Sequence, residues 1–151
     1  MRGVTSRSRL YRLRAASMVL LLATGAFFLI SAPAGAVDRI PPKFAGLKSA
    51  TTCIPGPIGP GRSSRYHLRW DPATDNRTPS SQIVYDVYQA RKSGGEDFSK
   101  PTYTTKPGAT SFDTPLLPAG NYSYYFVVRA RDRAGNRDSN TVERRGVNLC
   151  V

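Results

Sequence analysis

Hydrophobic and polar residues alternate with a period of two along three stretches of this chain, residues 66–70, 83–91 and 124–131. Successive side chains of a β-strand point to opposite sides, so this period predicts strands with one face buried. In the third stretch the predicted inward set is Tyr124, Phe126, Val128 and Ala130, and the predicted outward set is Tyr125, Val127, Arg129 and Arg131.

Shorter runs of β-branched and aromatic residues predict further strands, at residues 44–50, 103–105 and 110–112. A hairpin turn is predicted at residues 132–136, because Gly and Asn tolerate the backbone angles that such a turn needs. It leads into a return strand at residues 140–149. A proline-rich loop follows Cys53, and no stretch of the domain has a clear helical period. The pattern therefore predicts an all-β fold.

The first 36 residues have a different character. Residues 1–17 carry five arginines and no acid, residues 18–30 are apolar and uncharged, and Ala34 and Ala36 offer small side chains for cleavage. This is typical of a secretory signal peptide, and we expect cleavage after Ala36. The apolar run is shorter than the roughly 20 residues that span a bilayer. The prediction is a secreted domain over residues 37–151 without stable membrane insertion; an uncleaved N-terminal anchor is the alternative.

Charge narrows the classes of partner. The whole chain has a net charge of +12, and residues 37–151 retain 17 Lys and Arg against 10 Asp and Glu, a net charge of +7. The positive residues are spread along the chain, and only Arg91-Lys92 and Arg144-Arg145 are adjacent. Nucleic acid is not expected as a partner, because there is no basic arm and the aromatics of residues 124–131 alternate inward.

No enzyme and no cofactor are predicted. The single histidine, His67, falls on the outward side of its strand, and no phosphate loop, nucleophile elbow or zinc motif is present. The two cysteines, Cys53 and Cys150, form an even pair in an exported chain and therefore predict a disulfide.

Several of these residues together resemble a single fibronectin type III module of the kind found in secreted bacterial proteins. Trp70 is similar to the family's buried strand-B tryptophan, and Tyr85 to a core residue of strand C. Residues 117–136 resemble the E–F corner, strand F and the F–G hairpin. By this register Tyr124 is the corner tyrosine, whose hydroxyl bonds back to upstream backbone, and Tyr122 is the alternative.

The resemblance implies an immunoglobulin-like β-sandwich of about seven strands. In that fold strands A and G run parallel, which would bring Cys53 and Cys150 together at one end. The implied core is Leu68, Trp70, Tyr85, Val87, Phe126 and Val128.

The resemblance also makes residues 83–91 and 124–131 antiparallel neighbours. The expected register places Val84 opposite Arg131, Asp86 opposite Arg129 and Tyr88 opposite Val127, within two residues. Asp86 and Arg129 would then form an exposed ion pair. The outward residues Asp86, Tyr88, Tyr125, Arg129 and Arg131 form a candidate binding face for an acidic glycan or an extracellular protein; a solvated sheet face without a ligand is the alternative.

The expected function is that of a secreted, monomeric, non-enzymatic module that binds an extracellular or cell-wall polymer or a protein. A structural spacer without a ligand is the alternative. Oxygen-bearing side chains on two loops should share one end of the domain and could hold calcium. Their spacing matches no known calcium-binding loop, and turn formation explains their presence. No metal site is therefore predicted. These residues are Asp71, Asp75, Asn76, Asp132, Asn136 and Asp138.

Overall fold

The computed structural model describes residues 37–53, 61–121 and 123–150, which belong to one compact unit, Gly35–Val151. The predicted signal peptide at residues 1–36, most of the proline-rich loop and Tyr122 lie outside the described residues. No helix in the described part is long and apolar enough to cross a membrane. The elements are β1 (Ser49–Thr52), β2 (Ser63–Ser64), β3 (His67–Arg69), the 3₁₀ turn η1 (Ser80–Gln82), β4 (Val84–Ala90), β5 (Tyr103–Thr104), β6 (Ser111–Asp113), β7 (Leu117–Pro118), β8 (Tyr125–Arg131), β9 (Arg144–Arg145) and β10 (Val147–Asn148).

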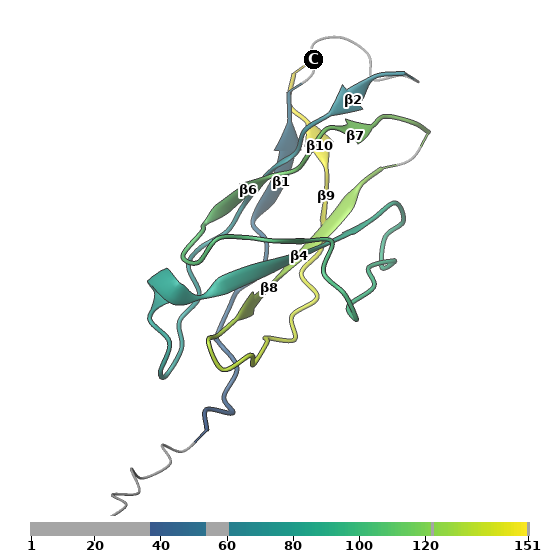
Figure 1. The fold of residues 1–151 in the computed structure, drawn as a ribbon. Coiled ribbons are helices and arrows are strands. Elements are labelled where there is room, and N and C mark those ends of the chain that lie inside the picture. The colour runs from purple at the N-terminus through teal and green to yellow at the C-terminus, as the bar shows by residue number, and fades with distance from the viewer. Residues whose placement is uncertain (1–36, 54–60, 122, 151) are drawn as a thin grey trace, which may run out of the picture. The chain divides into compact units, whose positions relative to one another are not determined.

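The strands form two four-stranded sheets and one small pair (Figure 1). One sheet has the order β10-β1-β3-β6 and the other the order β5-β4-β8-β9, while β2 pairs with β7. Among the described residues, the strand pairings are antiparallel except that between β1 and β10. The prediction of an all-β sandwich is confirmed.

The core lies between the inward faces of the two sheets. Leu68 of β3 and the residues Tyr85, Val87, Phe126 and Val128 of β4 and β8 are fully buried. The rings of Trp70 and Tyr85 pack 5.3 Å apart. Their polar atoms are also satisfied, because Trp70 Nε1 donates to the Ala109 carbonyl at 2.9 Å and the Tyr85 hydroxyl accepts from the Ala73 amide at 2.7 Å. The core predicted from the sequence is confirmed.

Tyr124 closes the corner that leads into β8. It is 3% exposed, and its hydroxyl donates to the Pro118 carbonyl at 2.9 Å. The bond ties the start of β8 to β7, six residues upstream. This is the contact predicted for a corner tyrosine, and it is confirmed for Tyr124.

The disulfide predicted between Cys53 and Cys150 is present, with the two Cα atoms 4.8 Å apart. Parallel pairing of β1 with β10 places the cysteines there, since Thr51 lies opposite Val147 and Thr52 opposite Asn148. The Leu149 amide also donates to the Thr52 carbonyl at 2.9 Å, so the ends of the two strands are joined by backbone as well as by sulfur.

Two strand boundaries differ from the prediction. The first strand was expected at residues 44–50, but regular pairing begins only at Ser49, and Lys43 makes an isolated bridge to Thr74. The last strand was expected as one segment, but it is divided at Gly146 into β9, which pairs with β8, and β10, which pairs with β1. The chain therefore changes sheets at this glycine.

Candidate functional site

The predicted binding face is the outward side of β4 and β8. The observed register agrees with the predicted one, with Val84 opposite Arg131, Asp86 opposite Arg129 and Tyr88 opposite Val127. The alternation within β8 also places Tyr125, Arg129 and Arg131 on this side.

The predicted ion pair between Asp86 and Arg129 is wrong, because Asp86 pairs with two other arginines. Arg131 Nε donates to Asp86 Oδ2 at 2.9 Å and Arg131 Nη2 to Oδ1 at 3.2 Å. Arg137 Nη2 lies 2.8 Å from Oδ2. Diagonal neighbours on one face of a sheet are within reach of a long side chain, so the residue directly opposite need not be the ion-pair partner.

Asp86 is a buried charge, with no exposed surface. The carboxylate also accepts a hydrogen bond from Thr104, whose hydroxyl donates to Oδ1 at 2.9 Å. Burial alone would raise the pKa of Asp86, but the hydrogen bonds from Arg131 and Thr104 and the charges of both arginines outweigh burial and lower it. Asp86 therefore remains ionised inside a cluster with a net positive charge.

Arg129 is held by a different set of contacts. Its guanidinium carbon lies 3.7 Å from the ring centre of Phe98 and 5.8 Å from that of Tyr88. Its Nε donates to the Asn140 carbonyl at 2.9 Å. Two segments outside the strands, around Phe98 and Asn140, therefore cover this part of the sheet.

This cover changes the predicted face. Tyr88 is 1% exposed and packs edge-on against Phe98 with ring centres 5.1 Å apart, and Asp86 is also buried. Arg129, Arg131 and Tyr125 are half-buried. Phe98 was the sequence signal for this cover, since it is an isolated aromatic residue in a polar loop. Whether the exposed remainder of the face binds a ligand stays a prediction.

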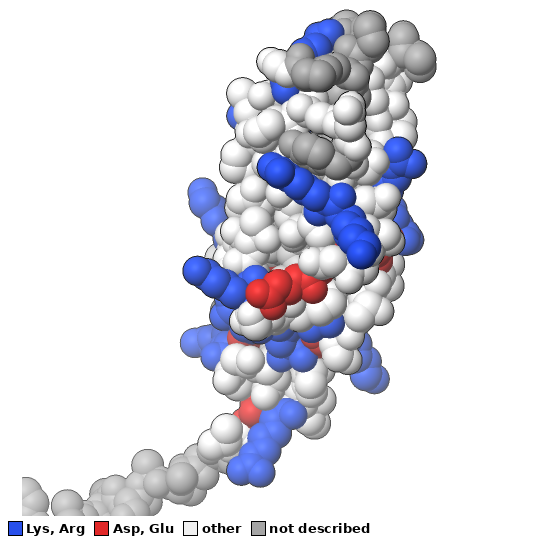
Figure 2. Space-filling model, turned by 90° about the vertical axis from the view of Figure 1, so that its right-hand side faces the viewer, with Lys and Arg blue, Asp and Glu red and all other residues white. Residues whose placement is uncertain are grey.

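Most exposed charges in the described part are positive. Of the 17 Lys and Arg in residues 37–150, 14 are exposed, whereas only three of the 10 Asp and Glu are. Two of these three are already engaged, Asp71 with Lys48 at 2.7 Å and Asp113 with His67 Nδ1 at 2.6 Å. Figure 2 shows Lys and Arg at many points of one face, with few acidic groups between them.

The two adjacent basic pairs are brought together at one end of the second sheet. Ala90, which precedes Arg91-Lys92, lies opposite Tyr125, and Tyr125 lies opposite Arg145. All four basic residues are exposed. We call Arg91, Lys92, Arg144 and Arg145 the cation cluster. The sequence showed the two pairs, but only the strand register shows that they lie at the same end of the sheet, on either side of β8.

A groove of about 420 Å³ adjoins the cation cluster through Arg145. Tyr66 and Tyr124, whose ring centres are 5.7 Å apart, lie at its base and are 7% and 3% exposed. Arg145 Nε donates to Ser123 Oγ at 2.9 Å across the lining. The groove also contains Ser64 and Asn148, so it offers hydroxyl and amide groups beside an aromatic surface and a cation.

The oxygen-bearing loops at the other end are only partly brought together. Asp71 pairs with Lys48, and Asp138 accepts bonds from the Ala130 amide and from Asn140. Asp138 is buried, and burial raises its pKa despite these bonds. Neither residue therefore joins Asp75 and Asp132, which do lie close together.

Comparison of the chain with protein-family models, with curated proteins and with solved structures finds no match.

Proposed function

We propose that the chain is an exported, non-enzymatic binding module of the fibronectin type III kind, and that its partner is an acidic polymer of the cell wall or the extracellular space. The Cys53–Cys150 disulfide fits an oxidising compartment, which supports export. The strand order of the two sheets and the Tyr124 corner support the family resemblance.

The distribution of charge carries this proposal. Seven of the 10 acidic side chains in residues 37–150 are buried or half-buried, whereas 14 of the 17 basic side chains are exposed. The surface is therefore more positive than the net charge of +7 suggests. Such a surface attracts polyanions and repels other cationic surfaces.

The cation cluster is the place where binding is best supported. Four exposed cations lie at one end of the sheet, and Arg144 and Arg145 are neighbours in β9, so their side chains leave the sheet on opposite sides. A polymer chain crossing this end would meet positive groups on either side and the aromatic groove beside them.

The test is binding of the full chain to an anionic polysaccharide, with a neutral polysaccharide of similar length as the reference. The variant replaces all four residues of the cation cluster with Gln. We expect about tenfold weaker binding, because four exposed contacts of about 0.3–0.5 kcal/mol each are lost. Binding by the wild-type chain should also weaken as salt is added.

The matched control replaces four exposed cations elsewhere, Arg39, Arg69, Lys100 and Lys106, with Gln, which removes the same charge. It should bind nearly as well as the wild type. Equal losses in both variants would show general charge attraction and no site. Binding to an acidic protein but not to the polysaccharide would change the class of partner.

A structural spacer is the second candidate, and the closure of the β4–β8 face favours it. Asp86, Arg129 and Arg131 are all engaged in contacts within the domain. Absence of binding to any anionic or neutral polymer would support this alternative.

A further inference from the structure

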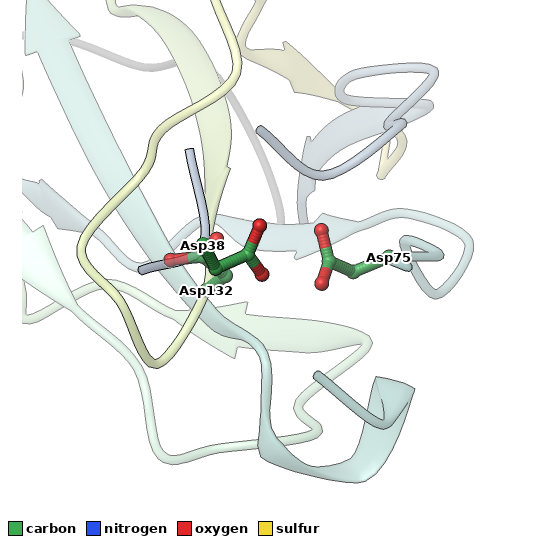
Figure 3. A group of neighbouring side chains, drawn as sticks. All are labelled: Asp38, Asp75 and Asp132. Carbon is green, nitrogen blue, oxygen red and sulfur yellow. The ribbon is translucent and has the colours of Figure 1, made fainter. Parts of the chain in front are cut away.

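Three aspartates from separate segments meet at the end of the domain opposite the disulfide. Asp38 lies before β1, Asp75 in the loop between β3 and β4, and Asp132 in the turn after β8. One carboxylate oxygen from each lies within 4.8 Å of the others. Figure 3 shows Asp38 and Asp132 overlapping in the view, with the carboxylate of Asp75 facing them from the other side.

Local hydrogen bonds orient each carboxylate. Asp75 Oδ2 accepts from the amides of Arg77 and Thr78 at 2.9 and 2.8 Å, which directs Oδ1 away from its own turn. Asp132, 3% exposed, accepts from the amide of Asn136 on Oδ1 and from its side chain on Oδ2. Asn136 also donates to the Asp38 carbonyl at 3.1 Å, which anchors the N-terminal segment beside the turn.

Two of the oxygens are shielded from solvent and have no hydrogen-bond partner. They are Asp38 Oδ2 and Asp75 Oδ1. Buried acceptors without a partner are rare, and each calls for a physical explanation. Among the described residues, none of the four ion pairs involves these three carboxylates. A second negative oxygen nearby increases the need for a positive group at this position.

Turn formation explains only part of this arrangement. It accounts for the oxygens that accept backbone amides, such as Asp75 Oδ2, but not for the two oxygens that accept nothing.

We propose that Asp38, Asp75 and Asp132 form a calcium site. The ligands are all oxygens and most are charged, which suits a hard cation and excludes the nitrogen and sulfur sets that zinc prefers. Calcium bonds of about 2.3–2.6 Å allow ligand oxygens up to about 4.6–5.2 Å apart across the ion, whereas magnesium allows only about 4.0–4.2 Å. The oxygens of the three aspartates lie within 4.8 Å of one another, a spacing that one calcium ion can bridge. Carbonyl oxygens and water would complete the shell.

A bound ion would join the N-terminal segment to the two loops at this end. The segment is otherwise attached there by the Asn136 bond to Asp38 and by the Lys43–Thr74 bridge. The site is separate from the cation cluster, so it goes beyond the proposed function and is tested independently of it.

The experiment measures thermal unfolding of the full chain in EDTA, in CaCl₂ and in MgCl₂, together with calcium titration by calorimetry. We expect calcium at about one hundred times Kd to raise Tm by about 10 °C, with a smaller shift in magnesium. Asp75→Asn and Asp38→Asn should each remove most of the calcium-dependent shift. If Asp75→Asn fails to fold, Asp38→Asn still tests the proposal, because Asp38 lies outside the strands and the core.

Asp97→Asn is the matched control. Asp97 also accepts an amide bond in a turn, from Ser99 at 2.9 Å, but it is exposed and stands apart from the three aspartates. This variant should keep the full calcium shift. The proposal is overturned if 10 mM CaCl₂, a level well above the roughly millimolar Kd of weak extracellular sites, leaves Tm unchanged, or if the shift persists in Asp38→Asn and Asp75→Asn.

Discussion

At the scale of single residues, Asp86 is the most deeply buried acidic side chain among the described residues. Arg131 and Arg137 neutralise it, and both remain about one third exposed, at 31% and 33%. The two arginines can therefore regain water if the carboxylate is lost, which Asp86 cannot do if they are lost. Loss of the Asp86 charge should therefore cost less unfolding free energy than loss of both arginines.

We predict that Asp86→Asn destabilises the domain by about 2–3 kcal/mol at pH 7, below the 3–5 kcal/mol typical of a fully buried pair because the arginines can rehydrate. The pKa of Asp86 is lowered in the folded state, so its contribution is present above the unfolded pKa and is lost as pH falls through the folded one. The difference between variant and wild type should therefore shrink toward pH 3. Urea unfolding at both pH values measures it, and an equal loss at both would contradict the role given to the ionised carboxylate.

Single-residue predictions from the sequence succeeded where a short contact decides the outcome. Tyr124 was located from its place before β8, and its hydroxyl can reach only the nearby corner. The partner of Asp86 was missed for the opposite reason. Register gives the positions of the Cα atoms, but the direction of a long side chain such as Arg129 depends on what covers it, here Phe98.

At the scale of elements, Gly146 is the point where the last strand leaves one sheet for the other. Its amide donates to the Tyr124 carbonyl at 2.8 Å, and the next residue already pairs with β1. A Cβ atom at this position would lie 2.3 Å from Cε1 of Tyr66. Tyr66 is 7% exposed and packs in the core, so its ring has little room to move.

We predict that Gly146→Ala destabilises the domain by about 1–3 kcal/mol, the usual cost of an added methyl in a packed core. In a Tyr66→Leu background, which lacks the aromatic ring, the same substitution should cost clearly less. The four unfolding free energies of this double-mutant cycle give the coupling between the positions. Strict additivity would mean that the ring is not what requires glycine here.

Alternation predicted the long strands well and the last one poorly. β4 and β8 are each seven residues long and pair with one strand on either side, so both are long enough for the alternating pattern to locate them. Residues 140–149 keep some alternation as well, but the pattern records only which side chains are buried. It does not record which sheet edge a strand pairs with.

At the scale of the whole molecule, the sequence predicted the fold class and the disulfide but not the distribution of charge. Net charge is a sum over residues, whereas the positive surface arises because Asp86, Asp132 and Asp138 are buried and most basic residues are not. The proposed calcium site was missed for a related reason, since Asp38 is 94 residues before Asp132 and only folding brings them together.

The disulfide is the constraint that acts on the whole chain, because it joins residues 97 positions apart. Closing a loop of this length removes conformational freedom from the unfolded chain, so loss of the disulfide should cost up to about 4.7 kcal/mol.

We predict that Cys53→Ser with Cys150→Ser lowers the unfolding free energy by about 2–4 kcal/mol. The value is below about 4.7 kcal/mol because measured effects of removing a disulfide usually fall below the loop-entropy limit. The β-sheet circular dichroism spectrum should persist, because the β1–β10 pairing and the core do not depend on sulfur. Reduction of the wild-type chain should reproduce the same loss, and thiol titration of the unreduced, denatured chain should find no free thiol. A reduced chain as stable as the oxidised one would show that the ends of β1 and β10 are held by their backbone pairing alone.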